Sequence, residues 1–215
     1  MSKEIWEDHW KKLENPSWFS HLARVFRAGW RARAVRDAFV NYFPEQGTFV
    51  ETGSGTSQTS ALIPRQGKTL IAVDYAKTPL TQARRFMDKC VVADIRKLPF
   101  RKNSIDGIRN LGVMEHYREE EQVHLLKEFH RVLRPKARIV LFWPPPYGFD
   151  KMIFETISAC AKVFGRRIEF FPDEPGRVMK RQAKHILERA GFQVVDIYLP
   201  LWDVCTELVV VGEKP

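Results

Sequence analysis

A short run of small and acidic residues, FVETGSGTSQTS at 49–60, has the composition of a ligand-binding turn. Its two glycines, Gly53 and Gly55, would let the backbone adopt positive φ angles and approach a ligand closely. Glu51 places a carboxylate beside this turn, where it would repel a pyrophosphate and attract a cationic group. The spacing of the turn is Gly-x-Gly-x-Ser, ending at Ser57, and not the Gly-x-Gly-x-x-Gly of a dinucleotide-binding turn. Charge and spacing together favour a cationic ligand over a nicotinamide dinucleotide.

Two further acids follow the turn, each at the end of an apolar run. Asp74 ends TLIAVD, about twenty residues after Gly53, where an acid can accept hydrogen bonds from both hydroxyls of a ribose. Asp94 ends the next run, KCVVAD. His116 and Tyr117 lie beyond a fourth run, and an imidazole suits proton transfer because its usual pKa is near neutrality. A histidine that only orders its loop is the alternative for His116.

Alternating strand and helix patterns must position these residues. Five strands are predicted from short, nearly continuous apolar runs, the pattern of strands covered on both faces, at residues 48–52, 69–74, 89–94, 105–111 and 138–143. A helix is predicted from Glu119 to Arg134, where acids at the start and arginines at the end complement the helix dipole. Such alternation predicts a parallel sheet with right-handed crossovers. The last two strands, 192–199 and 206–213, are joined by a short turn and are therefore expected to be antiparallel neighbours.

The predicted fold class is α/β, with a seven-stranded, mostly parallel sheet, one antiparallel strand near the C-terminus and helices on both faces. We predict an N-terminal helical lid or substrate segment at 1–44 and a main domain at 45–215 with a cap insert at about 147–180. These outer segments are rich in aromatic residues, which suits a binding pocket but also a core. The aromatic residues predicted to contact a substrate are Trp18, Trp30 and Tyr147.

The 215 residues carry a formal net charge of +9. Basic clusters at 20–44 and 162–189 could attract nucleic acid, an anionic membrane surface or an anionic substrate, and a solvated basic surface is the alternative. No apolar stretch approaches the eighteen or so residues that span a bilayer, and the N-terminus is acidic where a signal peptide is basic. A cytoplasmic protein is therefore expected. Its three separated cysteines predict reduced thiols and no metal site.

In order and spacing, these motifs resemble those of the class I S-adenosylmethionine-dependent methyltransferases, and most closely the type 11 group. The resemblance covers about residues 48–143. ETGSGTS resembles the first motif of the family, and the later motifs are IAVDYA, VVADIRKLPF, SIDGIRNLGVMEHY and LLKEFHRVLRPKARIVLF. Ser57 and Lys136-Ala137 depart from the commoner glycines of the family.

The resemblance implies a Rossmann-like fold, S-adenosyl-L-methionine as cofactor and S-adenosyl-L-homocysteine as product. It implies that Glu51 faces the charged end of the cofactor, that Asp74 binds the ribose and that Asp94 accepts a hydrogen bond from the adenine amino group. The residues implied to bind the cofactor are Glu51, Gly53, Ser54, Gly55, Asp74, Tyr75, Asp94, Ile95, Asn110 and Leu111.

Methyl transfer of this kind is an in-line displacement, in which the protein aligns the reactants and excludes water. A hydroxyl or a protonated amine as acceptor also requires a base, and His116 is the candidate, with Tyr117 on the same rim. The favoured acceptor is a small molecule. Two alternatives stay open at this point, namely methylation of RNA or protein, and a cofactor-binding module without catalysis.

Overall fold

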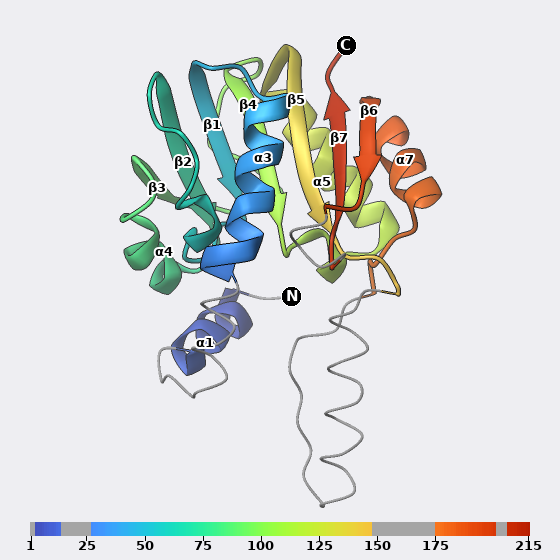
Figure 1. Cartoon of the computed structure of the whole chain (residues 1–215). Coiled ribbons are helices and arrows are strands. Elements are labelled where there is room, and N and C mark those ends of the chain that lie inside the picture. Colours follow the sequence, from blue (N-terminus) through green and yellow to red (C-terminus); the bar gives the residue numbers. More distant parts are fainter. Residues whose placement is uncertain (1–2, 14–26, 148–174, 201–205) are drawn as a thin grey trace, which may run out of the picture.

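The computed structural model of the protein describes residues 3–13, 27–147, 175–200 and 206–215 (Figure 1). Its centre is a seven-stranded sheet with the strand order β3-β2-β1-β4-β5-β7-β6. The strands are β1 (Gly47–Thr52), β2 (Lys68–Asp74), β3 (Lys89–Val92), β4 (Ile105–Leu111), β5 (Leu133–Trp143), β6 (Gln193–Tyr198) and β7 (Leu208–Glu213). β7 runs antiparallel to both β5 and β6, whereas the pairs from β3 to β5 are parallel. The predicted fold class, including the reversed strand, is confirmed.

Helices cover both faces of this sheet (Figure 1). The helical segments are α1 (Lys3–Leu13), the π-helical turn η1 (Arg27–Arg31), α3 (Ala32–Tyr42), η2 (Gln58–Ser60), α4 (Lys77–Ala83), η3 (Met114–His116), α5 (Glu119–Val132) and α7 (Lys180–Arg189). α5 has the polarity that its sequence predicts, because Glu121 accepts a hydrogen bond from the Arg118 amide at its start and Arg131 lies in its last turn. In the described part of the chain, none of the helices combines the length and the apolar character needed to cross a membrane.

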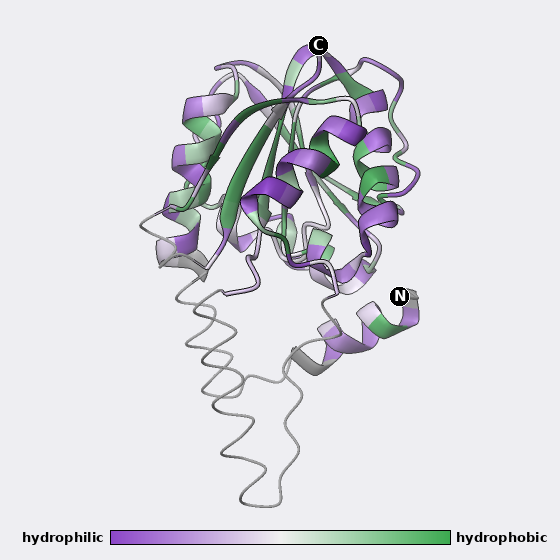
Figure 2. Cartoon of the chain, turned by 90° about the vertical axis from the view of Figure 1, so that its right-hand side faces the viewer, coloured by the Kyte–Doolittle hydropathy of each residue, from purple (hydrophilic) through white to green (hydrophobic). Residues whose placement is uncertain are grey.

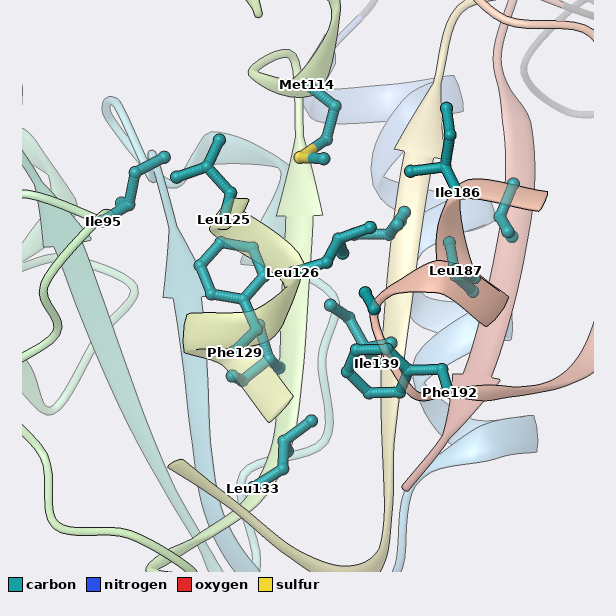
Figure 3. Packing of buried hydrophobic residues seen from close by; sticks show 14 of the residues in the cluster. Ile95, Met114, Leu125, Leu126, Phe129, Leu133, Ile139, Ile186, Leu187 and Phe192 are labelled. Carbon is teal, nitrogen blue, oxygen red and sulfur yellow. The ribbon is translucent and has the colours of Figure 1, made fainter. Parts of the chain in front are cut away.

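The core consists of two apolar layers, one on each face of the sheet. Side chains alternate along a strand, so that Val50 of β1 packs toward α5 and α7 whereas Phe49 packs toward α3. Figure 3 shows the first layer, in which Phe129 of α5 and Leu187 of α7 lie near Ile139 of β5. Figure 2 shows apolar strands between helices with hydrophilic outer surfaces. This packing fixes the strand ends, and with them the loops that carry the candidate site.

Two helical segments are short or divided. The turn at 53–57 leads only into the single 3₁₀ turn η2, and Pro64, which has no amide hydrogen, follows soon after it. The helical stretch before β1 consists of the π-helical turn η1 followed by α3. By contrast, β5 begins earlier than predicted because Leu133 already pairs with Ile105. Most of the predicted cap insert at 147–180, and Trp18 of the predicted lid, lie outside the described residues.

Candidate active site

The glycine turn after β1 has the backbone conformation that its sequence predicts. Gly53 has a φ of 63° and Gly55 a φ of 50°. A Cβ atom at Gly53 would lie 2.2 Å from Val113 Cγ2, and one at Gly55 would lie 2.7 Å from Trp10 Cζ2. Both positions therefore require glycine for two reasons, the left-handed backbone and the close approach of another side chain. Ser57 shares the left-handed conformation, with a φ of 53°.

Asp74 ties this turn to the end of β2. Its carboxylate accepts one hydrogen bond from the Gly55 amide at 2.8 Å and another from the Ala76 amide at 2.9 Å. Burial raises the pKa of the Asp74 carboxyl, against the effect of these two hydrogen bonds. The carboxylate is thus held in a fixed position at the carboxyl end of the strand, where open α/β sheets bind their ligands.

Glu51 makes contacts that the sequence does not predict. It is the in-register neighbour of Arg109 on β4, and the two buried side chains form an ion pair. Ser60 donates a hydrogen bond to Glu51 Oε2 at 2.8 Å and accepts one from Arg109 Nη2 at 2.6 Å. Arg109 also donates to Thr59 at 3.2 Å. The negative charge of Glu51 is therefore neutralised beneath η2, and Glu51 is not among the described residues that line the cavity next to the turn.

That cavity lies at the carboxyl ends of the central strands. Its lining residues are Trp6, Trp10, Gly53, Asp74, Tyr75, Asp94, Ile95, Arg96, Gly112, Val113, His116 and Tyr117. Seven of the residues singled out in the sequence are thus brought together, namely Gly53, Asp74, Tyr75, Asp94, Ile95, His116 and Tyr117. The described lining does not include Glu51, Ser54, Gly55, Asn110 or Leu111.

Asp94, on the side of the cavity nearest β3, is held by a neighbour that the sequence reasoning did not single out. The Arg96 guanidinium donates to both carboxylate oxygens of Asp94, with Nη2 to Oδ2 at 2.6 Å, and the Arg96 amide donates to Oδ1 at 2.9 Å. These bonds lower the pKa of the Asp94 carboxyl, and the hydrogen bond from the Arg96 side chain is the main cause. Asp94 is thus a stable anion, and its remaining lone pairs are available to a ligand.

Part of the cavity lining is aromatic. The rings of Trp6 and His116 are 5.1 Å apart between centroids, in an edge-to-face arrangement at 71°. The His116 amide donates to the Val113 carbonyl at 3.1 Å, which fixes η3 against the end of β4. Burial raises the pKa of the Tyr117 hydroxyl, so this side chain stays neutral. His116 and Tyr117 therefore lie on one rim, as expected.

Two of the predicted substrate residues are not in the described lining of this cavity, and the third, Trp18, lies outside the described residues. Trp30 and Tyr147 are 50% and 52% exposed and are absent from the described lining. In contrast, Trp6 and Trp10 of α1 line the cavity but were not predicted as site residues. Their spacing in WEDHW is a detectable signal, because positions i and i+4 share one face of a helix. Arg109 gives a second signal, because it is a lone basic residue inside an apolar strand.

The arrangement suits a nucleoside with a cationic group. Asp74 and Asp94 can accept hydrogen bonds from sugar hydroxyls and a base amino group, and the aromatic rings can cover apolar surface. Two buried polar atoms beside the turn, Ser57 Oγ and Asn110 Oδ1, make no hydrogen bond within the described residues. They are therefore acceptors that a ligand or water would satisfy.

Comparisons with known proteins agree with this geometry. Residues 50–141 match a family model described as a methyltransferase domain. The chain is 32% identical over 112 residues to the biotin biosynthesis bifunctional protein BioHC of Cellvibrio japonicus, a match to 49% of this chain and 22% of that protein. It is 26% identical over 175 residues to the O-methyltransferase cnsE of Penicillium expansum, a match to 77% of this chain and 59% of that protein. The matched part thus spans less than two thirds of the length of these curated relatives.

The fold is also that of solved methyltransferase structures. The magnesium protoporphyrin IX methyltransferase of Synechocystis PCC 6803, solved with bound S-adenosylhomocysteine, superposes with a TM-score of 0.70 and covers the whole of both chains. Its sequence identity to this chain is 14%, so this likeness concerns the fold alone.

Proposed function

We propose that this chain is a class I S-adenosylmethionine-dependent methyltransferase that transfers the methyl group of that cofactor to a small-molecule acceptor. The observation that carries the proposal is the single cavity in which the glycine turn, Asp74 and Asp94 meet His116. A cofactor-binding half and a candidate proton acceptor thus share one space.

Each residue of the cofactor half would have a distinct task. Bound S-adenosylmethionine supplies a methyl group attached to a positively charged sulfur. Loss of the methyl group leaves a neutral thioether, which is an excellent leaving group, so no acid is needed from the protein. Asp74 would accept the ribose hydroxyls, and Asp94 would accept the adenine amino group beside Tyr75 and Ile95. Gly53 would let the backbone lie against the ligand. Ser54, Gly55, Asn110 and Leu111 would support this surface from behind the lining.

His116 would act on the acceptor. Its place on the rim beside Tyr117 lets it take the proton of a hydroxyl or of a protonated amine as the methyl bond forms. The rest of the protein would align the two reactants and keep water away, which is the main requirement of this displacement.

Two features support a small acceptor. The described rim is aromatic, as in pockets for planar or apolar molecules. The relative from Penicillium expansum is named as an O-methyltransferase. The segments at 1–44 and 147–180, with Trp18, Trp30 and Tyr147, would complete the acceptor pocket of a cytoplasmic enzyme.

The net charge of +9 favours a second candidate, an enzyme acting on RNA.

Incubation with methyl-labelled S-adenosylmethionine and a metabolite extract tests the proposal. Label in a low-mass product supports a small acceptor. Label found only in protein overturns the proposal, and label found only in RNA overturns it in favour of the second candidate. Calorimetry with S-adenosylhomocysteine tests the cofactor separately. A folded chain that does not bind this nucleoside would overturn the enzyme assignment.

A further inference from the structure

α1 lies beyond the carboxyl ends of the strands and contributes two indoles to the cavity (Figure 1). Trp6 and Trp10 are four residues apart and therefore face the same way. Trp10 packs directly on the glycine turn, since a Cβ atom at Gly55 would lie 2.7 Å from its Cζ2 atom and 2.8 Å from its Cη2 atom. Trp6 packs against the His116 ring, 5.1 Å away between centroids. One helix thus contacts both the cofactor half and the candidate base.

Glu7, between the two tryptophans, fastens α1 to α4. Its Oε1 atom accepts a hydrogen bond from the Thr78 hydroxyl at 2.6 Å and a longer one from the Thr78 amide at 3.3 Å. Its Oε2 atom accepts the Lys77 amide at 3.0 Å. The N-cap residue of α4, Ala76, makes no side-chain capping bond, so Glu7 satisfies the free amides of the first turn in its place.

Asp74 and Glu7 bind consecutive residues of the turn between β2 and α4. Asp74 accepts a hydrogen bond from the Ala76 amide, and the next two residues, Lys77 and Thr78, bind Glu7. The turn is therefore held from the cavity side by the candidate ribose-binding acid and from the outer side by α1. Displacement of α1 would remove both the outer support of this turn and the indole that covers the glycines.

We propose that α1 is part of the cofactor site, with Trp6 and Trp10 as contact residues that cover the cofactor and Glu7 as the positioning residue that holds them there. The proposal rests on the proposed function, because it names further residues of the same site. The charge balance supports it. Glu51 is neutralised by Arg109, so the electron-rich faces of two indoles are the natural partners for a sulfonium next to the glycine turn.

Calorimetry of the full chain with S-adenosylhomocysteine and S-adenosylmethionine tests the proposal. We expect Trp10→Ala to weaken binding of both compounds about tenfold, and the loss to be larger for the sulfonium compound because only it carries the extra positive charge. Trp10→Phe keeps an aromatic face and should retain most of the affinity. Ile5→Ala is the matched control, since Ile5 is an exposed apolar residue on the same helix and does not line the cavity.

Glu7→Gln separates positioning from packing, because it leaves every lining residue unchanged. We expect several-fold weaker binding and an unchanged midpoint of thermal unfolding of the main domain, with Asp8→Asn, an exposed acid of the same helix, as control. Thr78→Val should add little to Glu7→Gln, since both remove the same contact.

If the unaltered chain does not bind either nucleoside, the proposed function fails. If the unaltered chain binds but Trp10→Ala and Glu7→Gln bind equally well, only the role of α1 fails. Should Trp10→Ala not fold, Glu7→Gln alone decides.

Discussion

Glu51 and Arg109 face each other across β1 and β4 and form an ion pair that is closed off from solvent, with exposures of 6% and 3%. The pair is completed by Ser60 and Thr59 of η2, which bind the two charged groups. Hydrogen bonds to the charged groups of Glu51 and Arg109 thus hold the short 3₁₀ turn η2 on the sheet. A longer helix would instead be held by apolar packing. The acid of the first motif has a structural role in addition to its expected role toward the cofactor.

Removing one partner of this pair should be costly. Arg109→Met would leave the Glu51 carboxylate buried without a counter-charge, and we expect a loss of about 3–5 kcal/mol in the free energy of unfolding. Denaturant unfolding measures the loss. Arg138→Met is the control, because its pair with Glu213 is partly exposed and should contribute about 1 kcal/mol or less. The double variant Glu51→Gln/Arg109→Met should recover part of the loss. Equal losses for Arg109→Met and Arg138→Met would contradict this account.

The buried acid Asp74 should make cofactor binding sensitive to acid. Burial raises the pKa of its carboxyl, so it takes up a proton at a higher pH than an ordinary aspartate, whose pKa is about 3.9. A protonated carboxyl can no longer accept both ribose hydroxyls. We expect the affinity for S-adenosylhomocysteine, measured by calorimetry over a pH series, to fall as the pH is lowered. Because the pKa of Asp74 is raised, this fall should begin at a higher pH than the titration of an ordinary aspartate. Asp74→Asn should bind S-adenosylhomocysteine weakly, and its affinity should not depend on pH in this range. If the affinity of this variant shows the same pH dependence, another group is responsible for it.

The same shift has a consequence for stability. Because the folded form of Asp74 binds its proton more tightly than the unfolded form, its contribution to the free energy of unfolding decreases as pH rises through the raised pKa. The ionised carboxylate therefore costs stability at neutral pH. Such a cost is common at binding sites, where a group is kept for function.

Asp94 should select the adenine base. Its carboxylate is kept ionised by Arg96 and would accept a hydrogen bond from the adenine amino group, which an inosine analogue lacks. We expect the chain to prefer S-adenosylhomocysteine over S-inosylhomocysteine by about 1.5–3 kcal/mol, the usual contribution of a hydrogen bond to a charged group. Asp94→Ala should abolish most of the preference in competition binding. Asp37→Ala, which removes an exposed acid of α3, should preserve it. An equal preference in Asp94→Ala and the unaltered chain would exclude this role.

Lys214 should stabilise the end of the sheet opposite the cavity, where β5 begins and β7 ends. Its ammonium donates to Asn103 Oδ1 at 2.7 Å and to the carbonyls of His130 and Leu133 at 2.7 and 2.8 Å, at the end of α5. Burial lowers the pKa of this ammonium. Lys214→Met would leave three acceptors unpaired, and we expect a loss of about 1–3 kcal/mol in the free energy of unfolding with unchanged cofactor affinity. Lys127→Met, on the exposed side of α5, is the control and should have a loss near zero. A weaker cofactor affinity in Lys214→Met would contradict the separation of the two regions.

The sequence was sufficient for the fold class and for part of the cavity lining. The parallel direction of the central strands follows from the alternation of apolar runs and helices, and Asp74 and Asp94 reach one cavity because parallel strands end at the same edge. Glu51 could not be placed in this way, since its partner Arg109 is fifty-odd positions away and becomes a neighbour only through the register of β1 and β4. Trp6 and Trp10 were missed for a related reason. Their helix could be predicted from periodicity, but its docking depends on the tertiary contact of Glu7 with Thr78.

The role of His116, as a base or as a loop residue, can be decided by substitution. As a base it would take a proton from the acceptor, whereas as a loop residue it would only pack against Trp6. His116→Phe separates these roles, because phenylalanine keeps an aromatic ring beside Trp6 but cannot accept a proton. With an acceptor identified, we expect kcat to fall about 10²–10⁴-fold, the usual contribution of general base catalysis, while the affinity for S-adenosylhomocysteine stays within a few-fold. His124→Phe, at an exposed position of α5, should keep both the rate and the affinity. A fully active His116→Phe would show that the histidine orders its loop and that the acceptor loses its proton to another group or to water.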